Sequence, residues 1–207
     1  MINLRIIGDV HGHIIDYKKL IQKAKYSIQV GDFGFDYGGL TDVDSSYHKI
    51  LGGNHDNYLE QDGVFVNQTA HFLGDFGNIE IPEIGDFFFV RGGRSIDKDY
   101  RIEGLTWFPQ EELNYKQSME AFDLYCQKKP KFVVTHECPT SIIDQVSWFK
   151  TWNGQSIAPS STANLLEQML LQHRPELWIF GHHHSSLDRK IDSCRFICLE
   201  ELECFDF

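Results

Sequence analysis

The sequence has little positive charge and no long apolar run. Its 207 residues include 19 Lys and Arg against 30 Asp and Glu, which gives a formal net charge of −11. Because phosphate backbones are bound by clustered Lys and Arg, this balance argues against long nucleic acid as the main partner. A bilayer span needs roughly 20 consecutive apolar residues, and no run approaches that length. We therefore expect neither a nucleic-acid groove nor a membrane span.

Paired cysteines are also missing. The five Cys are an odd number without a C-x-x-C spacing, at positions 126, 138, 194, 198 and 204. Cys194 and Cys198 could resemble a pair of metal ligands, but we interpret the cysteines as buried thiols near strands. The first five residues lead directly into a predicted strand, without the pattern of a signal peptide. We expect a reduced, cytoplasmic protein.

Linkers and repeats are absent as well. No Ser/Pro/Gly-rich stretch, block of like charge or repeated segment divides the chain. The length is within the range of one α/β domain. Hydrophobic residues make up 42% of the sequence and include 16 Phe, enough to fill a core. We predict a single domain over residues 1–207.

Metal-ligating residue types follow five apolar runs, at the point where each run ends. Small residues allow the backbone to turn sharply there, and open α/β sheets bind ligands at the carboxyl ends of their strands. The sequence therefore predicts a metal site assembled from strand ends. The five junctions are Gly8-Asp9-Val10-His11, Gly31-Asp32, Gly52-Gly53-Asn54-His55-Asp56, Thr135-His136 and Gly181-His182-His183-His184.

The hydrophobic periodicity predicts alternating strands and helices. Residues 3–9, 14–25 and 26–32 form a predicted strand–helix–strand unit, which implies a parallel pair with a right-handed crossover. Short apolar runs between 64 and 91, which include 64–66 and 70–73, favour antiparallel hairpins in a second sheet. We expect the tail to complete that second sheet. The remaining predicted elements are strands at 47–53, 131–136, 177–181 and 194–199, a helical turn at 56–61, and helices at 110–128 and 161–173, with Ser161 and Asn164 as candidate caps.

Each junction taken alone has a structural alternative, such as an ordinary turn in which Asp9 caps a helix. Their joint occurrence in one chain favours a metal site. Carboxylate oxygen, amide oxygen and imidazole nitrogen suit Mn, Fe, Zn or Ni, and thiols are not part of the set. A single Asp can bridge two cations about 3.5–4 Å apart, which together clamp a phosphoryl group undergoing in-line displacement.

The ordered motifs resemble those of the calcineurin-like metallophosphoesterase superfamily over residues 8–184. The resemblance implies an α/β (α+β) fold in which two packed mixed sheets are flanked by helices, a four-layer αββα sandwich. It also implies two divalent metal ions, with Mn favoured. By this resemblance Asp9, His11 and His184 hold the first metal, Asp32 bridges, and Asn54, His136 and His182 hold the second. His55 would be a non-ligand general acid, and His183 should point away.

The motifs depart from the Ser/Thr protein phosphatase branch in two places. Residues 31–39 contain no Arg, and the third motif ends in Asp56 where that branch has Glu. In the first of these stretches, the Asp that would orient the catalytic His, Asp36, is also shifted by one position. The chain therefore looks like a short, stand-alone bacterial or phage-type phosphoesterase.

Two arginines at the end of a Phe-rich run are candidate substrate ligands. Arg91 and Arg94 flank a pair of glycines, with Arg101 a little further along. Arg near a dinuclear site can bind the free oxygens of a phosphate. The alternative, an Arg bonded to loop carbonyls or to Asp97 and Asp99, fits the sequence equally well.

Our main functional hypothesis is a phosphoesterase acting on a small phosphomonoester or a nucleotide phosphodiester. A metal-bridged hydroxide would attack phosphorus, with Asp32 bridging the metals and His55 protonating the leaving oxygen. A metal-dependent nuclease is one alternative, although it would need a basic track. A binding module that keeps the fold without activity is another, and such a module should lack ligands that this sequence retains.

Overall fold

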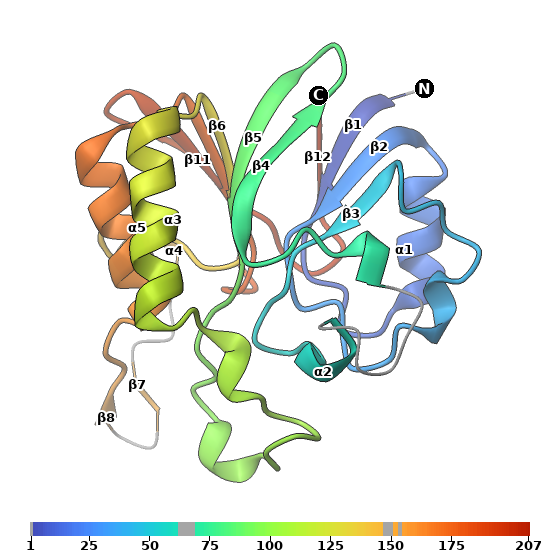
Figure 1. Cartoon of the computed structure of the whole chain (residues 1–207), viewed down its shortest axis with the longest axis horizontal. Coiled ribbons are helices and arrows are strands. Elements are labelled where there is room, and N and C mark those ends of the chain that lie inside the picture. Colours follow the sequence, from blue (N-terminus) through green and yellow to red (C-terminus); the bar gives the residue numbers. More distant parts are fainter. Residues whose placement is uncertain (1, 62–68, 147–150, 153–154) are drawn as a thin grey trace.

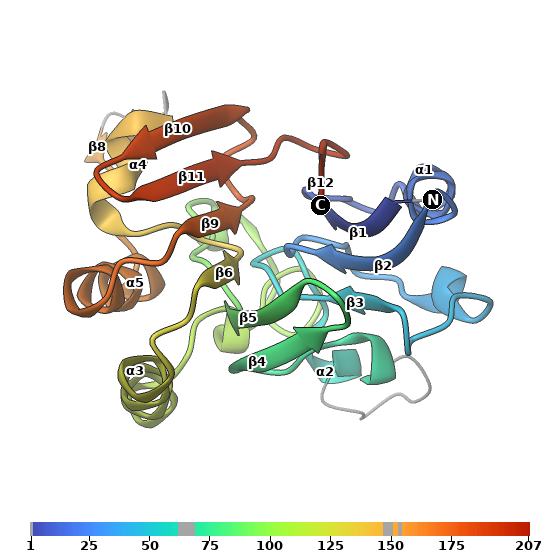
Figure 2. The same cartoon turned by 90° about the horizontal axis from the view of Figure 1, so that it is seen from above.

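The computed structural model describes residues 2–61, 69–146, 151–152 and 155–207. Two β-sheets face each other in it, and helices cover their outer faces (Figure 1). The predicted run at 64–66 lies outside the described residues. The predicted αββα sandwich is confirmed, with four layers visible from above (Figure 2).

The first sheet has the order β12-β1-β2-β3. Its strands are β1 (Ile2–Ile7), β2 (Ala24–Gln29), β3 (His48–Ile50) and β12 (Cys204–Asp206). Strands β1, β2 and β3 are mutually parallel, as the strand–helix–strand pattern predicts. The crossover helix α1 (Ile14–Ile21) packs on the outer face through buried Tyr17 and Ile21.

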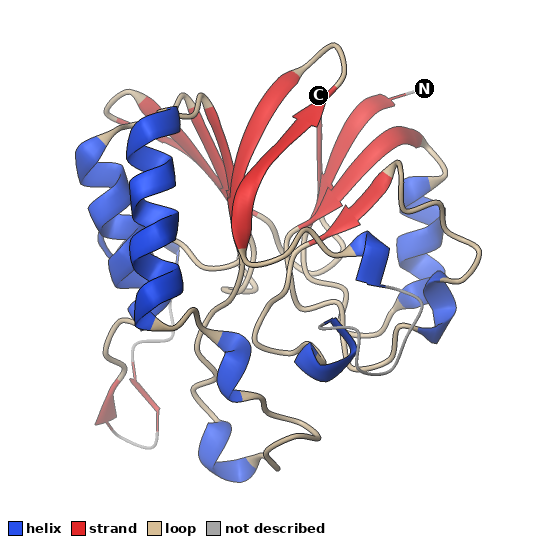
Figure 3. Ribbon diagram, in the orientation of Figure 1, coloured by secondary structure: helices blue, strands red, loops and turns tan. Residues whose placement is uncertain are grey.

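The second sheet has the order β10-β11-β9-β6-β5-β4. Its central strands β5, β6, β9 and β11 are parallel, and an antiparallel strand closes each edge. The strands are β4 (Phe76–Ile81), β5 (Gly85–Val90), β6 (Phe132–Thr135), β9 (Leu177–Phe180), β10 (Leu187–Ile191) and β11 (Cys194–Cys198). Helices α3 (Tyr115–Lys128), α4 (Thr140–Val146) and α5 (Ser161–Gln172) cover its outer face (Figure 3). A separate pair, β7 (Thr151–Trp152) and β8 (Gln155–Ser156), completes the strands.

Residues 87–90 of β5 are all apolar because both faces of the strand are buried there. Phe87 and Phe89 pack into the core between the two sheets, whereas Phe88 and Val90 belong to the core under α3 and α5. This alternation explains why the Phe-rich run lacks the polar positions of a half-exposed strand.

Local capping corrects one predicted helix start and the predicted caps of a second helix, whose predicted start at residue 161 is confirmed. Helix α3 begins at Tyr115, not at residue 110, because Asn114 and Gln117 form a reciprocal capping box. Pro109–Glu111 instead forms a 3-10 turn. Helix α5 is capped by Ser160, whose Oγ accepts a hydrogen bond from the backbone N–H of Ala163. Ser161 is therefore the first helical residue, and the predicted caps at Ser161 and Asn164 were wrong.

Two further predictions about strands were wrong. Residues 70–73 do not form a hairpin strand, because Thr69–His71 makes a 3-10 turn. The tail does not complete the second sheet, because β12 pairs antiparallel with β1 in the first. The Nε and Nη2 of Arg5 donate to the two carboxylate oxygens of Asp206 at 2.7 and 2.8 Å. This bidentate pair fixes the tail beside β1.

Two features of the described residues bear on the sequence predictions. All five cysteines lie among them as free thiols, and Cys138, Cys194 and Cys198 are buried. Within those same residues, none of the helices combines the length and the apolar character that crossing a bilayer requires.

Asp206→Ala should destabilise the protein. The Arg5 side chain is only 8% exposed, so losing its partner leaves a nearly buried guanidinium unpaired. We expect a loss of about 1–3 kcal/mol in the free energy of unfolding, measured by urea denaturation. Asp188→Ala is the matched control, because it breaks the same bidentate geometry with exposed Arg195 and should cost under about 1 kcal/mol. Equal losses would contradict the role of β12.

Candidate metal centre

The five motif junctions meet where the two sheets approach each other. Three follow β1, β2 and β3 of the first sheet, and two follow β6 and β9 of the second. Because the strands within each set are parallel, their carboxyl ends lie at one edge of their sheet. The predicted residues from both sheets come together there.

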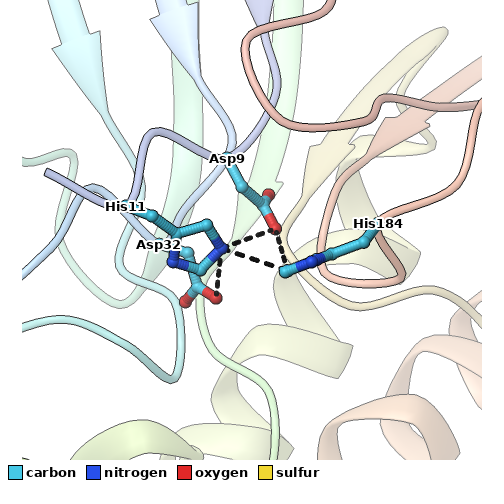
Figure 4. A group of neighbouring side chains, drawn as sticks. All are labelled: Asp9, His11, Asp32 and His184. Carbon is cyan, nitrogen blue, oxygen red and sulfur yellow. Dashed lines mark hydrogen bonds and ion pairs between the residues drawn. The ribbon is translucent and has the colours of Figure 1, made fainter. Parts of the chain in front are cut away.

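The first group of potential ligands contains Asp9, His11, Asp32 and His184 (Figure 4). The Nε2 atoms of His11 and His184 lie 3.0 Å apart. Asp9 Oδ2 lies 3.4 Å from the Nε2 of His184 and 3.8 Å from that of His11, and Asp32 Oδ2 lies 3.9 Å from the latter. Both carboxylates are buried, whereas the His184 side chain is about half exposed. Four ligating atoms therefore face one small volume near the surface.

The second group contains Asp32, His136 and His182. His136 Nε2 lies 3.2 Å from Asp32 Oδ1 and 3.0 Å from Asn54 Oδ1, so the amide oxygen of Asn54 joins this group. Asp32 belongs to both groups, with Oδ1 toward the second and Oδ2 toward the first. That is the arrangement a bridging carboxylate requires.

The hydrogen bonds around His136 provide a test of whether a cation fits. Its Nδ1 lies 2.9 Å from the carbonyl oxygen of Val30, which assigns the proton of the neutral ring to Nδ1. The lone pair of Nε2 then faces two oxygens, on Asp32 and Asn54. Lone pairs brought together in this way repel one another unless a proton or a metal ion lies among them. The donor set of oxygen and imidazole nitrogen fits a divalent ion.

A chain of buried polar groups orients Asn54. Its Nδ2 donates to Ser95 Oγ at 3.2 Å, and Ser95 Oγ donates to Glu111 Oε2 at 2.7 Å. All three residues are buried. Because the amide nitrogen is engaged, the Asn54 oxygen is left facing the site. The sequence analysis missed both residues, because Ser95 lies in a segment without periodicity or motif and Glu111 was assigned only to the start of the predicted helix at 110–128.

Glu137 is a second buried residue that the sequence analysis missed. Its Oε1 accepts a hydrogen bond from His183 Nε2 at 2.8 Å, and its Oε2 lies 3.6 Å from His182 Nε2. Cys138 Sγ also lies 3.3 Å from His183 Nε2. His183 therefore contacts Glu137 and Cys138 and belongs to neither ligand group above, in keeping with the alternation expected of the three histidines. The position of Glu137 directly after His136 was an available signal.

Comparison with known proteins identifies the family. A profile for calcineurin-like phosphoesterases matches residues 2–186. The chain belongs to this family. It is accordingly a metallophosphoesterase, a hydrolase acting on phosphate esters. A search among curated protein sequences gave no match.

Solved structures share the fold at low sequence identity. A phosphopantetheinyl hydrolase from Mycobacterium tuberculosis is 12% identical with a TM-score of 0.56, covering 99% of this chain and 95% of that one. A dimetal phosphatase from Danio rerio is 11% identical with a TM-score of 0.55, covering 97% and 87%. A putative 5′-nucleotidase from Staphylococcus aureus is 12% identical with a TM-score of 0.52, covering 97% of this chain and 48% of that one.

Asp56, the last residue of the third phosphoesterase motif, joins two site loops. Its carboxylate accepts hydrogen bonds from the backbone N–H groups of Asp32 and Gly34 at 3.0 Å and of Gly53 at 2.6 Å. These bonds hold the loop after β2 against the loop after β3. Asp56 does not contact the ring of His55 through any hydrogen bond of the described residues, so its role is to position the loops.

Two motif glycines are required by close approach. A Cβ built on Gly53 would lie 2.3 Å from Asp32 Oδ1, and one on Gly181 would lie 2.2 Å from Asp9 Oδ1. Any side chain would displace the carboxylate that forms the site. Four predicted ligands also adopt positive φ, a conformation that costs roughly 1–3 kcal/mol each in non-glycine residues. They are His11, Asp32, His182 and His184.

Burial shifts the pKa values of the acids at the site. It raises the pKa of Asp9 to about 8 and that of Asp56 to about 7, with Asp32 adding to both shifts. Burial alone would lower the pKa of His136, but Asp32 beside it raises that pKa to about 10. Burial opposes ionisation of Asp32, yet His136 holds its pKa well below the usual range. Without metal the site thus retains protons that a cation would displace.

His55 lies beside both ligand groups without belonging to either of them. Its backbone N–H donates to Asp32 Oδ1 at 2.7 Å, and its ring centroid is 5.3 Å from that of His11. Burial lowers the pKa of His55; Asp32 opposes the shift and Arg101 adds to it. A neutral imidazole is therefore held at the edge of the site.

The structure places Arg91 and Arg94 in contacts within the protein. Arg91 is buried, donates to Asp75 Oδ1 and the Gln110 carbonyl, and lies over the ring of Tyr58. Arg94 donates to the Ala158 carbonyl. These are the bonds of the alternative interpretation, so contact of either residue with substrate stays a prediction.

Metal should stabilise the protein more at high pH than at low pH. The folded pKa of Asp9 lies near 8 against an ordinary 3.8, and that of His136 near 10 against 6.5. Because the folded state binds the extra protons, the stability they contribute is lost as pH rises through these values. In thermal unfolding we expect the metal-free protein to be less stable at about pH 8.5 than at about pH 6, and the gain on adding MnCl₂ to be larger at about pH 8.5.

Asp9→Asn provides the comparison for this experiment. It should flatten the pH dependence of the metal-free protein and reduce the gain from Mn, whereas Asp36→Asn, at an exposed position, should change neither. A gain from Mn that is equal at both pH values in the wild type would contradict the proton–metal competition.

Proposed function

We propose that this protein is a dinuclear metal-dependent phosphoesterase acting on a small phosphomonoester or a nucleotide phosphodiester. The observation that carries the proposal is the position of Asp32 in both ligand groups, with one carboxylate oxygen toward each. One shared carboxylate between two sets of imidazole and carboxylate ligands is what a pair of adjacent cations needs.

The ligand assignment follows the two groups. Asp9, His11, Asp32 and His184 would hold one ion, and Asp32, Asn54, His136 and His182 would hold the other. When bound, the ions would activate water and neutralise charge on the phosphoryl group. Mn is the ion we favour, with Fe, Zn or Ni as alternatives, because the donors are oxygen and imidazole nitrogen without thiolate.

His55 would give a proton to the leaving oxygen. The bond from its backbone N–H to Asp32 fixes its position relative to the proposed bridging carboxylate, and neither ligand group needs its ring nitrogens. A general acid must be within hydrogen-bond reach of the leaving atom while remaining free of metal. The position of His55 supports that role, although burial and Arg101 lower its pKa in the free protein. The negative charge of a bound phosphate would therefore have to stabilise the protonated ring that gives the proton.

The substrate class rests on charge and on the relatives. The formal net charge of −11 favours a small phosphoester or nucleotide over long nucleic acid. The similar structures carry the titles of a phosphopantetheinyl hydrolase, a dimetal phosphatase and a putative 5′-nucleotidase. These proteins share the fold of this chain, and their titles support a soluble phosphoester as its substrate.

Mn-loaded protein should hydrolyse p-nitrophenyl phosphate, bis-p-nitrophenyl phosphate or a member of a nucleotide panel, and chelation should abolish that activity.

Asp32→Asn keeps the shape of the side chain but loses the charge, so it should retain fewer metal ions by elemental analysis than the wild type. His184→Ala should weaken mainly the first site. Two equivalents of metal in the Asp32 variant would rule out bridging, and a metal-loaded wild type inactive on every substrate would indicate a binding module.

His55→Ala should retain its metals but react slowly. For esters with a poor leaving group we expect a loss of about 10²–10⁴-fold in rate, the usual contribution of a positioned general acid. For p-nitrophenolate, which departs without protonation, the loss should be smaller. Measuring kcat for both kinds of ester, with metal content as the control, separates the roles. Equal losses would mean that His55 stabilises phosphoryl charge, and lost metal would mean that it is a ligand.

A further inference from the structure

Arg101 lies against His55 at the edge of the proposed metal centre. Its Nη2 is 3.1 Å from His55 Nδ1 and 3.2 Å from His55 Nε2. The in-plane directions of the two ring nitrogens diverge, and only one of them carries a lone pair in the neutral ring, so an atom almost equally close to both nitrogens lies along neither direction. The Nη2 N–H that faces His55 is therefore shared between the two ring nitrogens in a weak hydrogen bond, which a phosphate oxygen can displace.

Asp97 fixes the orientation of this guanidinium. Arg101 Nε donates to Asp97 Oδ1 and Nη2 to Asp97 Oδ2, both at 2.7 Å, and Nη1 donates to the Thr106 carbonyl at 3.1 Å. These bonds use three of the five N–H groups. Within the described part of the chain, the second N–H of Nη1 has no protein acceptor, and the second N–H of Nη2 meets only the ring nitrogens of His55. The side chain is 14% exposed, so little of its surface is open to water.

The position suits an anion bound between His55 and the metal ligands. A fixed guanidinium with unused donors binds phosphate oxygens well, because the cost of ordering the side chain is already met by the Asp97 pair. A phosphomonoester dianion offers three terminal oxygens and two charges. A diester offers two terminal oxygens and one charge, so an additional cationic donor favours the monoester.

We propose that Arg101 binds the phosphate group of the substrate and makes the protein prefer phosphomonoesters to phosphodiesters. The inference rests on the function proposed above. It assigns to a residue of the segment after β5 the phosphate contact that the sequence analysis placed on Arg91 and Arg94. Asp97 would act as the positioning residue for Arg101.

Two variants of Arg101 test the proposal in Mn-loaded protein. Binding of inorganic phosphate is measured by isothermal titration calorimetry, and kcat/KM is measured for p-nitrophenyl phosphate and bis-p-nitrophenyl phosphate. For Arg101→Gln we expect roughly 10- to 100-fold weaker phosphate binding and a similar loss on the monoester, with a much smaller loss on the diester. Arg101→Lys keeps the charge and a partner for Asp97 but lacks the planar fork, and should lose roughly 3- to 10-fold.

Arg195→Gln is the matched control. It removes another Arg that makes a bidentate pair, with Asp188, at an exposed position on β11, and it should leave phosphate binding and both activities unchanged. Circular dichroism and metal content establish that each variant is folded and loaded, and Arg101→Lys decides the question if Arg101→Gln does not fold.

Two results would overturn the proposal. One is unchanged phosphate affinity in both Arg101 variants. The other is an equal fractional loss of kcat/KM on the two esters, which would mean that Arg101 does not make the protein prefer monoesters. If the wild type cleaves neither ester, the proposed function fails, but the phosphate titration still decides whether Arg101 binds the anion.

Discussion

The burial of three carboxylates at the junction of the two sheets is the constraint on which the rest of the structure depends. Asp9, Asp32 and Asp56 are almost completely inaccessible to solvent, and buried charges need compensation by hydrogen bonds, by opposite charge or by protons. Asp56 receives backbone N–H groups from two loops, and Asp9 receives the N–H of His182. The acids that create the site thereby also join the segments that carry it.

That compensation links the two sheets. Asp9 follows β1 in the first sheet and His182 follows β9 in the second, so the bond between them crosses the interface. The close approach requires glycine beside each acid, as the distances from Gly53 and Gly181 show. Four residues at the same junction have positive φ: His11, Asp32, His182 and His184. Backbone strain of this kind persists only where surrounding contacts determine the conformation.

The fold and the site were predictable from the sequence where the information is local or repeated. Strand-end motifs recur five times with the same physical meaning, so the convergence of Asp9, Asp32, Asn54, His136 and His182 at one junction followed from parallel topology. The central strands were predictable because they are buried on both faces. The position of the C-terminal tail was not predictable, because the pairing of β12 with β1 depends on a contact between Arg5 and Asp206, which are 201 positions apart. The start of α3 depended on a cap, Asn114, four residues beyond the predicted boundary.

The segment between β5 and α3 shows the same limit at the functional site. Ser95 and Arg101 come from a stretch without strand or helix periodicity, and Glu111 comes from what was predicted as the first turn of the helix at 110–128. Each acts through a partner distant in sequence. Ser95 and Glu111 turn the amide of Asn54, and Asp97 turns the guanidinium of Arg101 toward His55. The strand-end motifs are common to the family, whereas this segment is where a chain of the family can acquire its own substrate contacts, because loops on a rigid scaffold can change without disturbing the core. The proposed ligands would thus fix the chemistry, and the segment after β5 is where its selectivity would be set.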